Sequence, residues 1–127
     1  MDLTDKIGSL LARKGREVWA VSPQASVYEA IEMMADKQVG ALLVIADERM
    51  VGVISERDYA RKVILKGKSS KQTQVRDIMT STVIFVTPDA TIEECMRIVS
   101  YQRIRHLPVV EGQKVVGVVS IGDLVKR

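Results

Sequence analysis

Serine and aspartate recur with the same spacing at two places, Ser55-x-x-Asp58 and Ser120-x-x-Asp123. Each pair follows an apolar stretch, a pattern that predicts a strand passing directly into a helix. An aspartate in the first turn of a helix stays ionised, because the helix dipole and the free N–H groups favour negative charge. Such a carboxylate can accept hydrogen bonds from two neighbouring hydroxyl groups, which a ribose offers. The pattern therefore favours a ribonucleotide, but a capping box without any ligand, worth about 1 kcal/mol, needs the same residues.

Cationic side chains that could bind a phosphate lie near only one end of the chain. Residues 103–106 read Arg-Ile-Arg-His, whereas the corresponding residues 38–41 are uncharged. Charge-assisted hydrogen bonds to phosphate contribute about 1.5 to 3 kcal/mol each, so we expect unequal sites, the basic one better suited to phosphate. Arg57 could also reach a phosphate. The alternatives are surface solubility for Arg103 and Arg105, and strand packing for His106.

An internal repeat positions both pairs. Residues 18–62 align with residues 83–127 at an offset of 65, without a gap and with twelve identities. Each copy predicts the order β-α-β-β-α, in a mixed α/β fold. The expected strands are 18–21, 42–45, 50–54, 83–86, 107–110 and 114–119, and the expected helices are 26–37, 91–99 and those that begin at Ser55 and Ser120.

The two copies are expected to form one module. About 45 residues cannot bury enough surface to be stable alone, so the copies should pack face to face around a pseudo-two-fold axis and leave two clefts. Gly52 and Gly117 leave room for a backbone or a ligand. We expect an N-terminal helix in residues 1–16 without a counterpart in the second copy, the first copy in 17–66, a linker in 67–79 and the second copy in 80–127.

Composition excludes several classes of function. The 127 residues carry a net charge of +3 and 4% aromatic residues, which argues against nucleic-acid binding. No apolar run approaches the ~20 residues of a membrane span, no secretory signal is apparent, and the single cysteine suits the cytoplasm. No nucleophile with a base and no metal-ligand cluster is present, so we expect no catalytic residues and no metal. Cys95 and Trp19 are interpreted as core residues, with dimer packing also open for Trp19.

The two copies resemble a pair of cystathionine β-synthase (CBS) domains. The resemblance covers residues 17–127 and is carried by Arg105-His106-Leu107-Pro108-Val109-Val110, by the 117–123 segment Gly-Val-Val-Ser-Ile-Gly-Asp, and by Val75-Arg76-Asp77-Ile78-Met79. The first copy departs from the pattern, since residues 40–43 contain no proline or basic residue. This departure predicts weaker phosphate binding in one cleft.

The resemblance implies that each cleft combines residues of both copies. The first would contain Ser55, Arg57, Asp58, Val86, Thr87, Arg103, Ile104, Arg105, His106 and Pro108. The second would contain Val21, Ser22, Val39, Gly40, Ala41, Ser120 and Asp123. The implied ligands are AMP, ADP, ATP, S-adenosylmethionine or NAD(H), and none would serve as a catalytic cofactor. The resemblance further implies a homodimer that regulates a partner protein; a protein-interaction module without a nucleotide is the alternative.

Overall fold

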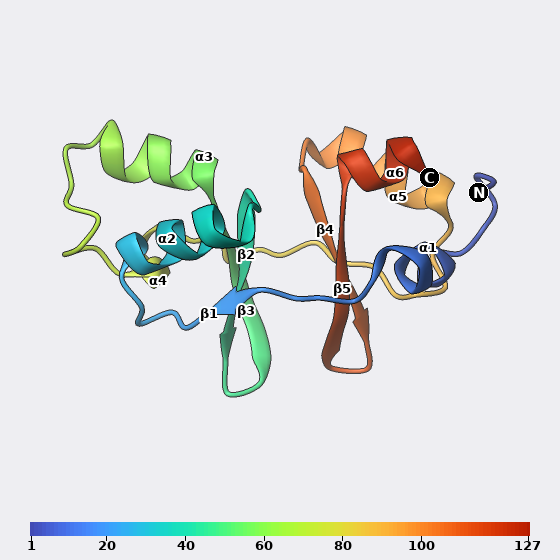
Figure 1. Ribbon diagram of the computed structural model, residues 1–127, viewed down its shortest axis with the longest axis horizontal. Helices are drawn as coiled ribbons and strands as arrows, with labels where there is room; N and C mark the ends of the chain where they lie inside the picture. Colours follow the sequence, from blue (N-terminus) through green and yellow to red (C-terminus); the bar gives the residue numbers. More distant parts are fainter. The chain divides into compact units, whose positions relative to one another are not determined.

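The computed structural model describes all residues, 1–127, and they form two compact units (Figure 1). The first-repeat unit comprises Trp19–Val83, and the second-repeat unit comprises Met1–Val18 together with Ile84–Arg127. Each unit therefore contains one sequence repeat and a segment that lies outside that repeat. None of the helices combines the length and the apolar character that crossing a bilayer requires.

The first-repeat unit is a three-stranded sheet with helices. Its elements are β1 (Ala20–Val21), α2 (Val27–Lys37), β2 (Ala41–Ala46), β3 (Arg49–Ser55), α3 (Glu56–Tyr59), the π-helix η1 (Ala60–Ile64) and α4 (Val75–Ile78). Strand β1 pairs with β2 in parallel, and β2 pairs with β3 in an antiparallel ladder. Apolar side chains from α2, the sheet, η1 and α4 form one core, against which Trp19 packs.

The second-repeat unit is built around a two-stranded hairpin. Its elements are α1 (Ile7–Lys14), α5 (Ile92–Gln102), β4 (His106–Glu111), β5 (Lys114–Ser120) and α6 (Ile121–Lys126). A separate core joins α1, α5, the hairpin and α6, and Cys95 is fully buried in it. Cys95 is thus a core residue, as expected. Burial raises the pKa of its thiol to about 11, so the thiol is protonated.

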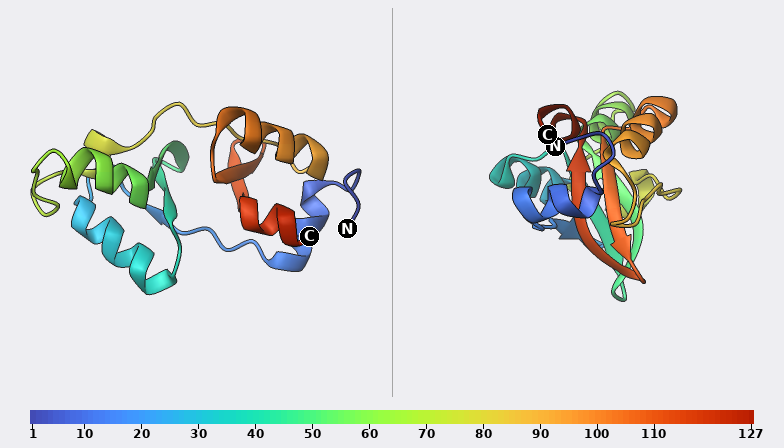
Figure 2. Two further views of the ribbon diagram at one scale, coloured as in Figure 1. Left: turned by 90° about the horizontal axis from the view of Figure 1, so that it is seen from above. Right: turned by 90° about the vertical axis from the view of Figure 1, so that its right-hand side faces the viewer.

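Helix α1 does have a counterpart, contrary to the prediction, and the counterpart is α4. The Ile7 N–H donates to the Ala90 carbonyl at 2.7 Å, and the Val75 N–H donates to the equivalent Ala25 carbonyl at 2.9 Å. Gly8 and Arg76 likewise donate to the carbonyls of two aligned prolines. Figure 2 shows α1, in blue, with the helices and hairpin of the second-repeat unit. The second repeat is thus completed by α1, which precedes the first repeat in the sequence. The first repeat is completed by α4, which follows the strands of that same repeat.

The two glycines ahead of the Ser-Asp pairs accommodate these short helices. A Cβ atom at Gly117 would lie 2.8 Å from Leu11 Cδ2, and one at Gly52 would lie 2.7 Å from Met79 Sδ and 2.9 Å from the Thr80 carbonyl oxygen. The close approach expected at these glycines is therefore made by the chain itself.

The expected strand 83–86 is reduced to a single bridge between Val86 and Val109. In the first repeat, the Leu43 N–H donates to the Trp19 carbonyl at 3.1 Å and extends the parallel ladder. Pro108 occupies the position of Leu43 in the second repeat and has no N–H to donate. The other expected strands and helices form, although the strand expected at 18–21 is shortened to Ala20–Val21. The helix expected from Ser55 continues after α3 as the π-helix η1 to Ile64, and α4 is additional.

We predict that Gly52→Ala lowers the free energy of unfolding more than Gly117→Ala. The new methyl group at residue 52 meets a backbone carbonyl, whereas at residue 117 it meets only the end of a leucine side chain that can rotate. Overpacking of this kind costs about 1 to 3 kcal/mol, and urea unfolding of both variants measures it. An equal loss in the two variants would contradict the packing described at Gly52.

Candidate functional site

Both Ser-x-x-Asp pairs lie at the point where a strand becomes a helix. Ser55 ends β3, its Oγ accepts from the Asp58 N–H at 3.1 Å, and its N–H donates to Asp58 Oδ2 at 3.0 Å. Ser120 and Asp123 form the same two bonds, at 3.1 and 2.8 Å. The capping box that the sequence allowed is therefore present twice, and it fixes each carboxylate against the backbone of its corner.

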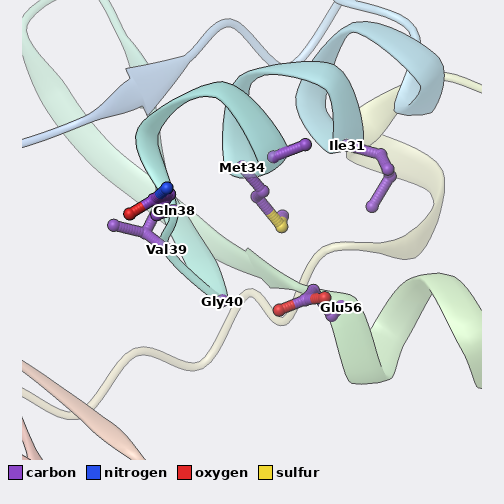
Figure 3. Close-up of a pocket in the computed structure, with 7 residues that line it drawn as sticks. Ile31, Met34, Gln38, Val39, Gly40 and Glu56 are labelled. Carbon is purple, nitrogen blue, oxygen red and sulfur yellow. The ribbon is translucent and has the colours of Figure 1, made fainter.

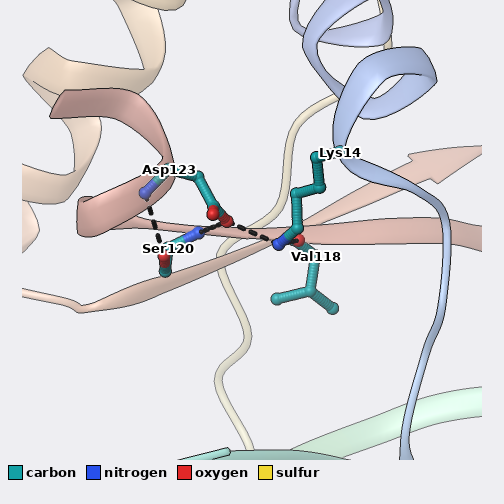
Figure 4. Close-up of polar contacts among 4 residues, drawn as sticks. All are labelled: Lys14, Val118, Ser120 and Asp123. Carbon is teal, nitrogen blue, oxygen red and sulfur yellow. Dashed lines mark hydrogen bonds and ion pairs between the residues drawn. The ribbon is translucent and has the colours of Figure 1, made fainter. Parts of the chain in front are cut away.

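A lysine completes each corner, and the sequence interpretation did not include either one. Lys62 Nζ lies 3.0 Å from Asp58 Oδ1 and donates to the Ile78 carbonyl at 2.9 Å. Lys14 Nζ, from the end of α1, forms an ion pair with Asp123 Oδ2 and donates to the Val118 carbonyl at 2.8 Å (Figure 4). The i, i+4 spacing could have revealed Lys62. Lys14 lies 109 residues from Asp123, so no local spacing indicates it.

The two carboxylates differ in the oxygen atoms that the protein already uses. At Asp58, the cap occupies Oδ2 and Lys62 occupies Oδ1. At Asp123, the cap and Lys14 share Oδ2, and Oδ1 has no hydrogen-bond partner within the protein. A hydroxyl group can therefore donate to Asp123 Oδ1 without any competing contact, whereas at Asp58 it must share an oxygen with Lys62.

Both aspartates are partly shielded from water. The exposed fraction of the side chain is 14% for Asp58 and 27% for Asp123. Burial alone would raise the pKa of Asp123, but the hydrogen bonds from Lys14 and Ser120 and the charge of Lys14 outweigh it, so the pKa is lowered. Asp123 is therefore an anion over the whole physiological range.

His106 lies beside the Asp123 corner, where it pairs with Ser120 across the hairpin. Burial lowers the pKa of His106, and the charges of Lys14 and Arg105 lower it further against the opposing effect of Asp123. The imidazole is consequently neutral at pH 7. At this strand the cations that could attract a phosphate are therefore the exposed arginines 103 and 105.

Strand pairing places the start of β2 and the start of β4 beside the serine of the same repeat. Ala41 pairs with Ser55, and the Glu56 N–H donates to the Gly40 carbonyl at 3.0 Å. In the second-repeat unit the Ile121 N–H donates to the Arg105 carbonyl, also at 3.0 Å. The structure thus brings residues 40–41 and 105–106 next to a Ser-Asp pair of their own repeat.

The predicted site residues are divided between the two units. The first-repeat unit contains Val21, Ser22, Val39, Gly40, Ala41, Ser55, Arg57 and Asp58, and the second-repeat unit contains Val86, Thr87, Arg103, Ile104, Arg105, His106, Pro108, Ser120 and Asp123. Val86 and Pro108 are linked by a backbone hydrogen bond of 3.0 Å, and Arg57 is exposed on the first turn of α3. Each predicted cleft draws on both units, and its assembly stays a prediction.

A hollow of about 310 Å³ lies entirely within the first-repeat unit (Figure 3). It is lined by Ile31, Met34, Ala35, Gln38, Val39, Gly40 and Glu56. Val39 and Gly40 were predicted as site residues. Glu56 was not, although it directly follows the serine of the first pair.

These corners, repeated within a two-unit α/β fold, are shared with a known class of proteins. The family model of the CBS domain matches this chain twice, over residues 12–65 and 75–127. The chain therefore belongs to the CBS domain family, and the resemblance and the fold class expected from the sequence are confirmed.

Solved structures of CBS proteins have the same fold. The CBS domain protein NE2398 is 47% identical with a TM-score of 0.93, and 96% of this chain and 95% of that one are covered. A putative signal-transduction protein with CBS domains from Burkholderia ambifaria MC40-6 is 45% identical with a TM-score of 0.92, covering 96% and 92%. The CBS domain pair of protein MJ0100, solved with 5′-methylthioadenosine and S-adenosyl-L-methionine, has a TM-score of 0.86 at 22% identity, covering 97% and 94%.

A curated relative extends beyond the matched region. The mitochondrial CBS domain-containing protein CBSX3 of Arabidopsis thaliana is 38% identical over 130 residues, which include 94% of this chain. The chain spans 63% of the length of that relative.

We predict that Lys14→Met makes the free energy of unfolding depend less on acid pH, because Asp123 then contributes less to it. Because the folded pKa of Asp123 is lowered, its stabilising contribution is present above the unfolded pKa of about 3.9 and is lost as the pH falls through the folded value. Without Lys14 this contribution shrinks, at a cost of about 0.5 to 1 kcal/mol near pH 7. Urea unfolding at pH 7 and pH 3 measures both changes.

Lys6→Met is the matched control, because Lys6 forms a highly exposed ion pair with Asp89 at 3.3 Å. This variant should unfold like the unmodified protein at both pH values. An equal effect of the two substitutions would contradict the special role of Lys14.

Proposed function

We propose that this chain is a non-catalytic regulatory module that binds an adenine nucleotide at its Ser-x-x-Asp corners. The observation that supports the proposal best is the position of the two aspartates. Both are partly buried and are fixed by a capping box at a helix start. A rigid carboxylate at such a position suits the two hydroxyl groups of a ribose. The adenosyl ligands of the MJ0100 CBS pair agree with this class of ligand.

Regulation would arise from differential affinity. A ligand that contacts residues of both units stabilises the arrangement of the units that it fits best, and so shifts the equilibrium seen by a partner protein. AMP, ADP, ATP and NAD(H) are the proposed candidates, and no step of this mechanism requires catalysis. The proposed site comprises the two clefts described from the sequence.

A homodimer is also proposed, and exposed apolar side chains support it. Tyr101 on α5 and Val125 on α6 are 84% and 64% exposed, and a shallow hollow of about 390 Å³ beside Tyr101 is lined by further α5 residues. Such side chains favour burial against another surface. They are also the observation that favours the alternative function, a protein-interaction module without a physiological nucleotide.

We predict that at least one of AMP, ADP, ATP and NADH raises the melting temperature, since a ligand that binds only the folded state stabilises it. Asp58→Ala and Asp123→Ala should reduce ligand affinity about tenfold or more, because each loses a charged acceptor. Thermal shift measures the rise in melting temperature, and calorimetry measures the loss of ligand affinity in the two variants.

Glu94→Ala is the control for the loss of a helix cap. Glu94 occupies the same position in the capping box of α5 and is not one of the predicted site residues. It should lower the melting temperature, because a helix cap is lost as in the aspartate variants, but leave ligand affinity unchanged. No stabilisation by any of these nucleotides at millimolar concentration would contradict the proposed function.

A second prediction concerns the phosphate. Because His106 is neutral, Arg105→Ala should weaken the binding of ADP about tenfold while changing adenosine binding little. Arg97→Ala removes an exposed arginine of α5 that pairs with Glu93 and serves as the control. Equal losses for ADP and adenosine would exclude a role of Arg105 in phosphate recognition.

A further inference from the structure

The hollow of the first-repeat unit has an apolar wall and one acidic side chain. Ile31, Met34 and Val39 provide much of the wall, and Figure 3 shows Glu56 at the start of α3, across the hollow from Met34. The volume of about 310 Å³ is at the lower end of the range for small-molecule sites. Glu56 is the only residue of the lining that carries a charge.

The backbone around the hollow adds to this negative potential. Helix α2 ends at Lys37, and its C-cap Gln38, which lines the hollow, has a left-handed backbone with φ 56°. The carbonyl end of a helix carries partial negative charge. A phosphate group would therefore meet repulsion from Glu56 and from the helix end, whereas an uncharged or donor-bearing group would not.

The corresponding positions of the second repeat have the opposite charge. At the offset of 65, Gln38 corresponds to Arg103, Gly40 to Arg105 and Glu56 to Ile121. The backbones agree, because Arg103 has φ 55° and the Ile121 N–H donates to the Arg105 carbonyl as the Glu56 N–H donates to Gly40. One acidic side chain in the first repeat is thus replaced by two arginine side chains in the second repeat, at positions where the backbone geometry is the same. Both repeats keep the Ser-Asp capping box, so the charge at these three positions is a difference that a phosphate group would meet directly.

We propose that Glu56 determines the specificity of the first-repeat hollow, which takes the uncharged nucleoside part of a ligand and rejects phosphate. The inference rests on the proposed nucleotide-binding function and assigns the ligand class of one region of it. The phosphate of a ligand binds to the arginines of the second repeat instead. Long-range repulsion of this kind acts over about 8 Å at physiological salt, so it reaches across the hollow.

The test uses the full chain with ¹³C-labelled methionine methyl groups. The Met34 methyl group lines the hollow and is assigned by its loss in Met34→Leu. Adenosine and ADP are titrated while the shift of this resonance is followed. The expected result is that adenosine shifts it at a concentration about tenfold lower than ADP, and that Glu56→Gln reduces this ratio to about threefold or less.

Glu32→Gln is the matched control, because Glu32 is an exposed carboxylate of α2 outside the lining of the hollow. It should leave the ratio unchanged. The inference is overturned if Glu56→Gln and Glu32→Gln give the same ratio, or if ADP is preferred by the unmodified protein. It is also overturned, with the proposed function intact, if ligands raise the melting temperature but leave the Met34 resonance unmoved. If no adenosine compound raises the melting temperature or moves the resonance, both proposals fail together.

Discussion

The structure depends on one interaction that occurs at both Ser-x-x-Asp corners, the bond between the carboxylate of the Asp and the backbone N–H of the Ser at the start of a helix. Asp58 and Asp123 each accept the N–H of the serine three residues earlier, and the serine hydroxyl accepts in return. This exchange ends a strand, begins a helix and fixes the direction of the carboxylate. A side chain that stabilises the corner therefore does not have to be ordered again when a ligand arrives, which removes part of the entropic cost of binding. The helix-capping and ligand-binding interpretations of the Ser-x-x-Asp pairs are for this reason compatible.

The corners are supported by segments that the repeat itself does not contain. Helix α1 packs Leu11 against Gly117, and the segment after α4 packs Met79 and Thr80 against Gly52. The two segments also contribute to the lysine contacts in different ways. Lys14 is itself a residue of α1, whereas Lys62 lies outside α4 and donates to its last carbonyl. Each unit is completed by a short helix together with a lysine that reaches an aspartate. The N-terminal segment is thus part of the Asp123 corner and does not act as a separate appendage.

Much of this fold could be predicted from periodicity and capping signals. The expected helix at 26–37 forms as Val27–Lys37 after its N-cap Ser26, and both hairpins have the expected strands. The missing strand at 83–86 required tertiary knowledge, because only the pairing with Pro108 reveals that a donor is absent. The equivalence of α1 and α4 was hidden because their sequences differ and their offset is not that of the repeat. Lys14 could not be found for a similar reason, since the chain brings it to Asp123 across 109 residues. The sequence therefore predicted most elements that neighbouring residues decide, although the local pair of Lys62 with Asp58 was missed, and it did not predict the contacts that distant residues make.

The central claim is that the two aspartates recognise the vicinal hydroxyl groups of a ribose. Calorimetric titration with AMP and with 2′-deoxy-AMP tests it most directly, in the unmodified protein and in the Asp58→Ala, Asp123→Ala double variant. Loss of one hydroxyl group bonded to a carboxylate should weaken the unmodified protein's affinity about tenfold or more, and the double variant should bind the two compounds alike. Equal affinity of the unmodified protein for AMP and 2′-deoxy-AMP would contradict ribose recognition by Asp58 and Asp123.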